Sequence, residues 1–221
     1  MRVFCICTEQ NSTSRRQADR CVESAKPFGI DVERFPSVSW THIRPTATLL
    51  DLDLRLEPHY SRSTTETHCP AFRIANGLTH YQLYQDCSTG VAPICIVEHD
   101  AVFVGPLPET PTCGVMQISS HRDGQADDEW YRNGMSSGRH VGWECRTPDF
   151  TRPGIITHPY TKTVGTSGYI ITPLAADRMV DHIQKHGVAF ADCIHRDIVG
   201  PMWMAIPQPV EMHKDGPIAY Y

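Results

Sequence analysis

The sequence predicts an α/β protein built as one domain over residues 1–221, with a mostly parallel central sheet flanked by helices. The run Val91–Val97 is short, apolar and rich in branched side chains, which is typical of a strand buried on both faces of a parallel sheet. The chain also opens with a strand pattern at Val3–Cys7, followed by a helix pattern and a second strand pattern. That order is a βαβ unit, the building block of α/β sheets.

Capping and turn residues delimit the opening unit. The polar loop Thr8–Thr13 is expected to supply a Ser or Thr N-cap to a helix at Ser14–Lys26, whose apolar residues recur at helical spacing. Pro27 and Gly29 end this helix, and an extended pattern resumes at Ile30–Phe35. These residues predict strand, helix and strand in succession.

The next part of the chain combines an irregular segment with a long helix. Residues 36–66 contain prolines at 36, 45 and 58 and show no hydrophobic period, so an insertion or long lid is expected there. Pro70 begins a helix with one apolar face, and Gly90 lies beyond its end. Strand patterns follow at Val91–Val97, Ala101–Val104 and Cys113–Ser119.

The last part begins with a polar, glycine-rich segment at residues 120–153, which predicts a substrate-facing loop. Thr172 and Pro173 together form a helix start signal, and Gly187 is a stop signal after His186. The expected elements, in order, are a strand at Gly168–Thr172, a helix at Pro173–His186, an apolar stretch at Ile198–Ile206 and a tail at Pro207–Tyr221.

Composition narrows the class of protein. The net charge of −5 and the single Arg15-Arg16 pair do not favour an extended nucleic-acid groove. The opening apolar run is too short for a signal peptide, and no apolar segment approaches the roughly 18 residues of a membrane span. The nine cysteines include no CxxC pair, so a reducing, cytoplasmic location without structural zinc is expected.

The acidic tip, Glu98-His99-Asp100, ends the apolar run Val91–Val97. Ligands of α/β folds bind at the carboxyl ends of such strands. On an extended backbone, two carboxylates one residue apart point the same way and can reach one hard cation, Mn²⁺ or Mg²⁺, with the phosphates that it carries. The alternative interpretation is a polar strand end that merely turns into solvent.

Four segments of the chain resemble glycosyltransferase family 25, whose members add sugars to lipopolysaccharide and collagen and have a GT-A fold. In the first segment, the opening strand with Arg15-Arg16 is similar to the family's first strand and its following arginine. The second and third segments are Ile74–His80 and Ile94–Val102, which contains the acidic tip. The fourth, Gly165–Ile171 with Ala175-Ala176, is the most specific, because it combines a glycine pair, a tyrosine and a helix start.

This resemblance implies a GT-A-like domain that transfers a sugar from a nucleotide-sugar donor, with UDP as the expected nucleotide, to an acceptor hydroxyl, with inversion. It assigns Asp100 to the metal and Glu98 to the ribose or to the hydrated face of the ion, whereas His99, in place of the family's middle acid, points away from the metal. The remaining implied roles are His213 as a second metal ligand, Lys214 as a phosphate contact, Thr8, Glu9 and Arg15 at the nucleotide, Thr166 and Ser167 at the donor, and Asp192 or Asp197 as the base.

Two other functions fit the same residues. A metal-dependent hydrolase would use the acidic tip around an activated water and would need His99 as a ligand. A non-catalytic nucleotide- or sugar-binding protein would have the site without a placed proton acceptor. For a transferase, the acceptor can be a saccharide, a protein hydroxyl or a hydroxymethylated DNA base.

Overall fold

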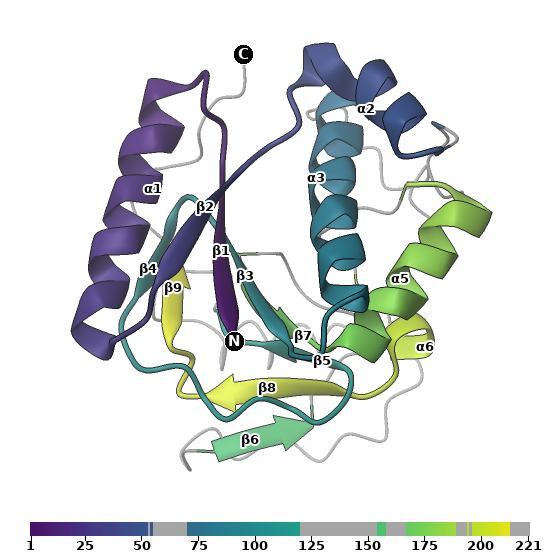
Figure 1. The fold of residues 1–221 in the computed structure, drawn as a ribbon. Coiled ribbons are helices and arrows are strands. Elements are labelled where there is room, and N and C mark those ends of the chain that lie inside the picture. The colour runs from purple at the N-terminus through teal and green to yellow at the C-terminus, as the bar shows by residue number, and fades with distance from the viewer. Residues whose placement is uncertain are drawn as a thin grey trace, which may run out of the picture.

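Seven strands form one sheet within the residues that the computed structural model describes, which are 1–52, 54, 70–119, 154–157, 167–188, 194 and 196–212. Figure 1 shows this sheet between two groups of helices. The strands, in their order across the sheet, are β2 (Val32–Pro36), β1 (Arg2–Cys7), β3 (Ile94–Glu98), β7 (Gly168–Ile171), β5 (Val115–Gln117), β8 (Met202–Ile206) and β6 (Gly154–Thr157).

The sheet is mixed rather than uniformly parallel. β2, β1 and β3 are parallel neighbours, and β5 is parallel to β8. β7 runs antiparallel to both β3 and β5, and β6 runs antiparallel to β8. Five of these seven strands therefore point the same way, so the predicted α/β class is confirmed, while the reversed β7 in the middle of the sheet was not expected.

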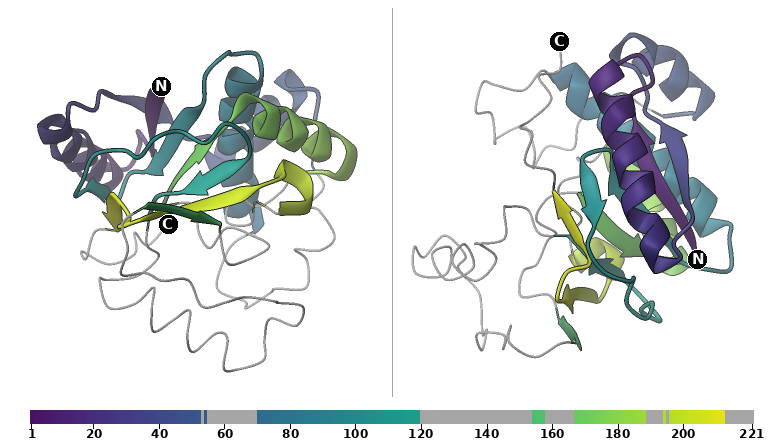
Figure 2. Two further views of the ribbon diagram at one scale, coloured as in Figure 1. Left: turned by 90° about the horizontal axis from the view of Figure 1, so that it is seen from below. Right: turned by 90° about the vertical axis from the view of Figure 1, so that its left-hand side faces the viewer.

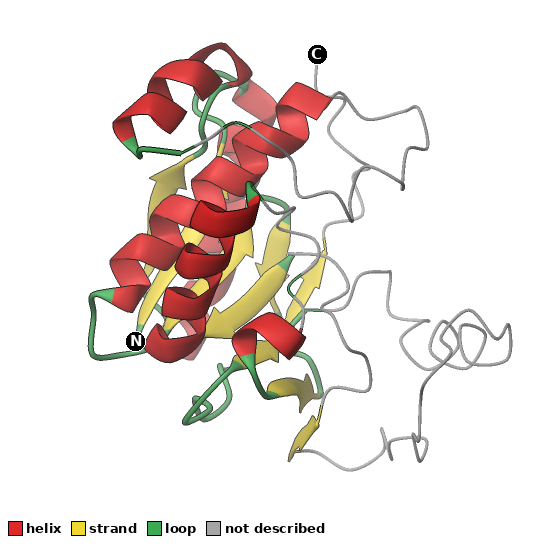
Figure 3. Ribbon diagram, turned by 90° about the vertical axis from the view of Figure 1, so that its right-hand side faces the viewer, coloured by secondary structure: helices red, strands yellow, loops and turns green. Residues whose placement is uncertain are grey.

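Helices cover both faces of the sheet. α1 (Ser12–Ala25) lies on one side, the α1 face, whereas α2 (Ile43–Leu49), α3 (Pro70–Ser88) and α5 (Pro173–His186) lie on the other, the α3 face (Figures 1 and 3). Figure 2 shows α1 from its outer side, with the strands behind it.

Alternating strand residues build a separate core on each face. In β1, Phe4 and Ile6 join the core under α3 and α5, whereas Val3, Cys5 and Cys7 join the core under α1. β3 and β7 alternate in the same way. Because both faces are covered, these strands read as continuous apolar runs, as the sequence predicted.

A second, two-stranded sheet pairs β4 (Ala101–Phe103) with β9 (Val210–Met212) in antiparallel register. It packs on the side of α1, where the Phe103 amide donates a 2.9 Å hydrogen bond to the Ser24 hydroxyl. The prediction of a tail at Pro207–Tyr221 is therefore wrong for Val210–Met212, which form β9. β9 has only three residues, one of them the charged Glu211, and this is too short for a strand pattern to be recognised in the sequence.

Other boundaries also differ from the sequence-based expectations. Asn11, not a Ser or Thr, caps α1 by accepting hydrogen bonds from the amides of Thr13 and Ser14. α2 and the 3-10 turn Trp40–His42 occupy part of the predicted insertion at 36–66. Pro45 is tolerated because it stands in the first turn of α2, where a helix needs no amide donor. Residues 120–153, the other predicted loop, lie outside the described residues.

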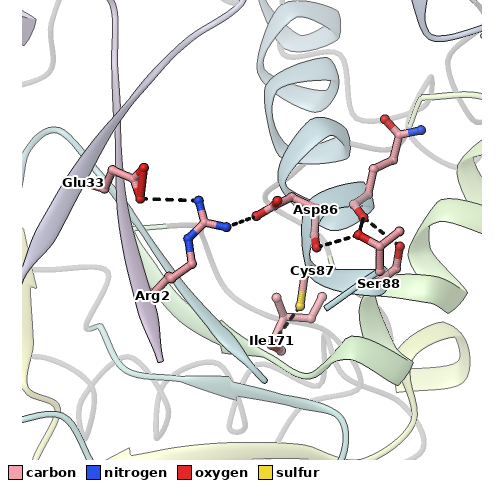
Figure 4. A network of polar contacts seen from close by, with 8 residues as sticks. Arg2, Glu33, Asp86, Cys87, Ser88 and Ile171 are labelled. Atoms are coloured by element: carbon pink, nitrogen blue, oxygen red, sulfur yellow. Dashed lines mark hydrogen bonds and ion pairs between the residues drawn. The ribbon is translucent and has the colours of Figure 1, made fainter. Parts of the chain in front are cut away.

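The amino edge of the sheet, where β1 and β3 begin, carries an exposed ionic network (Figure 4). Arg2 contacts Asp86 of α3 at 2.8 Å and Glu33 of β2 at 3.4 Å. Its guanidinium also lies 4.5 Å from the ring centroid of Phe4. Arg2 thus joins three elements at the edge opposite to the acidic tip. Among the described helices, none is long and apolar enough to cross a membrane.

Candidate functional site

The strand order places a topological switch point between β1 and β3. β1 is hydrogen-bonded to β2 on one side and to β3 on the other, and all three are parallel. The connection from β1 to β2 runs through α1, whereas the connection from β2 to β3 returns through α2 and α3 on the other face. Open α/β sheets bind their ligands outside the carboxyl ends of the strands at such a point.

Polar residues gather at this carboxyl edge from four neighbouring strands. Thr8 follows β1, Ser37 follows β2 and the acidic tip ends β3. Because β7 is antiparallel, its first residues also reach this edge, and Ser167 precedes it there. The structure therefore brings together three predicted site segments, those at Thr8, Glu98 and Ser167, from distant parts of the chain.

Hydrogen bonds join these segments in pairs. The Ser37 amide donates to the Cys7 carbonyl at 2.8 Å, and the hydroxyls of Ser37 and Thr8 share a hydrogen bond of 2.9 Å. The Glu98 amide donates to the Ser167 carbonyl at 3.3 Å. Ser37 was missed because it lies in the predicted insertion. The rule that neighbouring parallel strands end at one edge could have found it, since the strand before it was recognised.

The acidic tip has a different geometry from the predicted one. β3 ends at Glu98, and His99 and Asp100 form a turn rather than extended backbone. Strand alternation places Glu98 on the α3 face, where its charge adds to the effects of burial and of Tyr84 that raise the pKa of Tyr169. The turn at His99 and Asp100 interrupts the period of two from which parallel carboxylates were expected.

The Asp100 carboxylate acts on a group of the α1-face core. Contact with the Cys21 thiol and burial raise the pKa of Cys5, which belongs to the α1-face core, and the Asp100 carboxylate adds to this rise. The Oδ1 atom of Asp100 is buried and has no hydrogen-bond partner within the described part of the chain. A buried carboxylate oxygen is costly unless a donor or a cation meets it. Asp100 is thus suited to hold a cation.

His99 differs from its acidic neighbours in exposure. Its side chain is 6% exposed, whereas Glu98 and Asp100 are half-buried. Burial lowers the pKa of His99, and the Asp100 carboxylate partly offsets that effect. His99 therefore lies in the protein interior between two less buried carboxylates.

The predicted metal centre is only partly described. The described ranges hold no group of three or more His, Cys, Asp or Glu residues that could bind a metal ion. His213, the expected second ligand, lies outside them, as do Lys214, Thr166 and Asp192. The last described residue before His213 is Met212, which pairs with Ala101, the neighbour of Asp100. The register of β9 thus leads the chain to the acidic tip.

Residues of the loop between β1 and α1 form hydrogen bonds with one another and with the start of α1. Asn11 accepts from the amides of Thr13 and Ser14, and its carbonyl accepts from the Arg15 amide at 3.0 Å. The exposed Arg15 donates from its guanidinium to the Glu9 carbonyl at 3.1 Å. The Thr13 and Ser14 amides, which a phosphate at this helix start would use, are therefore already bonded within the chain. Arg15 and Glu9 lie together beside Thr8.

Asp197 lies away from these residues. It belongs to α6 (Arg196–Val199), which leads into β8, and Met202 at the start of β8 is in register with Val115. Val115 is in turn in register with Ile171, which pairs with Ile94 at the start of β3. Asp197 therefore precedes the amino edge of the sheet, opposite to the acidic tip. The structure does not bring it to the candidate site.

Behind the carboxyl edge, a buried polar trio links α3 to β7. His80 Nδ1 lies 2.7 Å from the Tyr169 hydroxyl, which lies 3.0 Å from the Tyr84 hydroxyl. All three side chains are at most 1% exposed, and burial lowers the pKa of His80 to about 3. Nothing in the sequence pattern indicates the two tyrosine partners of this buried histidine.

No protein-family model and no curated protein sequence matches the chain.

Proposed function

We propose that the protein is a metal-dependent glycosyltransferase that moves a sugar from a nucleoside diphosphate to an acceptor hydroxyl. The observation that carries the proposal is the set of polar residues around the switch point: Thr8, Ser37, the acidic tip and Ser167. A mixed α/β sheet with helices on both faces is compatible with a GT-A-like arrangement.

The residues at this edge divide into two groups by chemistry. Thr8 and Ser37 offer hydroxyls, which suit the sugar and base of a nucleotide, while Arg15 beside them supplies a cationic fork for a phosphate. Asp100 offers a carboxylate oxygen without a hydrogen-bond partner among the described residues. Glu98 is the last residue of β3, just before the turn that contains Asp100. In this proposal, Glu98 contacts the ribose or the hydrated face of the ion.

Asp100 and His213 would hold the cation, Mn²⁺ or Mg²⁺, and a carboxylate with an imidazole suits Mn²⁺ in particular. When bound, the cation neutralises charge that develops on the diphosphate leaving group. The pairing of Met212 with Ala101 supports a role for His213, because it directs the chain toward Asp100. Lys214 would contact the phosphates, and Thr166 and Ser167 the donor sugar.

Inverting transfer needs one carboxylate that accepts the proton of the acceptor hydroxyl as its oxygen bonds to the anomeric carbon and the bond to the diphosphate breaks. We assign this role to Asp192 rather than to Asp197, because Asp197 precedes the amino edge of the sheet. The acceptor is a saccharide, a protein hydroxyl or a modified nucleobase.

Release of UDP from a panel of UDP-sugars, measured with and without Mn²⁺, tests this function. Asp100→Asn keeps the size of the side chain and removes its charge, so we expect release at least about a hundredfold slower. Asp197→Asn is the matched control, and its rate should stay unchanged. Turnover that persists in Asp100→Asn would disprove the metal role. Binding of UDP without release from any sugar would instead indicate a non-catalytic nucleotide-binding protein.

A further inference from the structure

Two consecutive residues of α3, Thr79 and His80, contact segments on both sides of the candidate site. The Thr79 hydroxyl oxygen accepts a 2.9 Å hydrogen bond from the amide of Val38, the residue after Ser37. His80 Nδ1 shares its 2.7 Å hydrogen bond with the hydroxyl of Tyr169. Since Ser37 follows β2 and Tyr169 lies in β7, one turn of α3 bridges the outer two of the four strands β2-β1-β3-β7.

These contacts are made in the protein interior. Thr79 and His80 are fully buried, and the Tyr169 side chain is 1% exposed. The Nε2 atom of His80 is buried with no hydrogen-bond partner within the described ranges, a cost that an apolar residue of similar size would avoid. If the joined segments separated, each of these buried polar groups would lose its partner, so the hydrogen bonds favour one arrangement of the segments.

The start of β7 is also held from the α1 face. A Cβ atom at Gly168 would lie 3.3 Å from side-chain atoms of Ile118, Ser119 and Val97, so the backbone is already close to its neighbours there. The Gly168 carbonyl accepts hydrogen bonds from the Ile118 amide at 3.1 Å and the Ser119 hydroxyl at 3.2 Å. On the opposite face, the hydrogen bond between the Tyr169 hydroxyl and His80 also holds the start of β7 in place.

We propose that Thr79, His80 and Tyr169 are positioning residues that hold Ser37 and Ser167 at the separation that a nucleotide-sugar donor needs. This inference rests on the proposed function, and none of the three residues is assigned a contact with the donor. They act through the backbone. Thr79 holds the amide of Val38, the residue after Ser37. Tyr169 holds β7, and the carbonyl of Ser167, just before β7, accepts a hydrogen bond from the Glu98 amide. Supporting groups of this kind set how well a binding site is preorganised.

Tyr169→Phe and Thr79→Val test the proposal in the full chain, because each removes one hydroxyl and keeps the shape of the side chain. Tyr84→Phe is the matched control, since it removes the terminal hydroxyl of the trio and leaves the bond between His80 and Tyr169 intact. Isothermal calorimetry gives the Kd for UDP in the presence of Mn²⁺. Amide hydrogen exchange, resolved at Val38 and Glu98, gives a local readout.

We expect Tyr169→Phe to weaken UDP binding about tenfold, in the range found for supporting residues of metal sites. Its Glu98 amide should exchange faster, and Thr79→Val should speed exchange at Val38, whereas Tyr84→Phe should change the Kd less than about twofold. Equal losses of affinity in Tyr169→Phe and Tyr84→Phe would overturn the proposal, because the trio would then serve packing alone.

Two further outcomes are informative. If Tyr169→Phe does not fold, Thr79→Val decides, and an unchanged Val38 amide and Kd in that variant would overturn the proposal. If the wild-type protein binds no UDP with Mn²⁺, the proposed function is wrong. The exchange of the Val38 and Glu98 amides still tests the positioning role, which unchanged exchange in both variants would refute.

Discussion

The buried neutral His80 predicts a specific loss of stability in acid. Its pKa in the folded protein is lowered by burial to about 3, from an ordinary value of 6.5 that the unfolded chain regains. The unfolded state therefore binds a proton at a higher pH than the folded state does. The stability that this difference provides is fully present above pH 6.5 and is lost progressively as the pH falls toward 3.

The magnitude follows from the distance below the ordinary pKa. At about pH 5 the unfolded histidine is largely protonated and the folded one is not. This pH lies about one and a half units below the ordinary pKa, and at about 1.4 kcal/mol per unit the protein loses about 2 kcal/mol of stability. His80→Asn removes the titrating ring while keeping a polar group close to the Nδ1 position. We expect it to be less stable at pH 7.5 by about 1–3 kcal/mol because of the lost ring volume.

Urea unfolding, followed by circular dichroism at pH 7.5 and pH 5, separates the two effects. Between these pH values the wild-type protein should lose about 2 kcal/mol more stability than His80→Asn does. Other groups with lowered pKa values, His99 among them, are present in both proteins and cancel in the comparison. The same pH-dependent loss in both proteins would refute the assignment of a buried, unprotonated His80.

Three further predictions use urea unfolding at neutral pH. Gly114 has φ +85°, and a Cβ atom there would overlap the Pro201 carbonyl oxygen. Gly114→Ala should therefore lower the free energy of unfolding by about 3 kcal/mol or more. A smaller loss of stability would mean that this contact is loose. Leu83 is fully buried, so Leu83→Ala should lower stability by about 2–5 kcal/mol. Leu174 is 53% exposed, so Leu174→Ala should change stability by less than about 0.5 kcal/mol. Similar losses in the two variants would contradict the assigned core. Arg2→Ala should cost no more than about 1 kcal/mol, because both of its ion pairs face solvent, and a larger loss would show that the network in Figure 4 couples β1, β2 and α3 more strongly than exposed pairs do.

Elements with local start and stop signals were predicted well. α5 follows the Thr172 cap and Pro173 and ends before Gly187, and α3 begins at Pro70, as expected. β3 begins at Ile94 rather than Val91, because Val91 is fully exposed and precedes the strand. Such boundaries depend on residues that are neighbours in sequence, so the pattern itself contains the information.

The candidate site was predictable only in part. The residues of the acidic tip and Thr8 were found because each follows a recognisable buried strand. Ser37 lies in the predicted insertion, where the sequence indicates no site residue. The turn at His99 and Asp100 replaces the extended backbone that the motif predicts. The edge to which a residue belongs depends on the direction of its strand in the sheet, which no local pattern contains.

The sequence by itself determined the α/β class, the order of most helices and strands, and the segments that carry polar residues at strand ends. Only the tertiary structure decided that β7 runs antiparallel beside β3, that β9 returns to pair with β4 next to Asp100, and that Asp197 precedes the opposite edge of the sheet. Helix and strand patterns arise from residues a few positions apart, whereas strand order and direction are set by hydrogen bonds and apolar packing between segments many tens of residues apart.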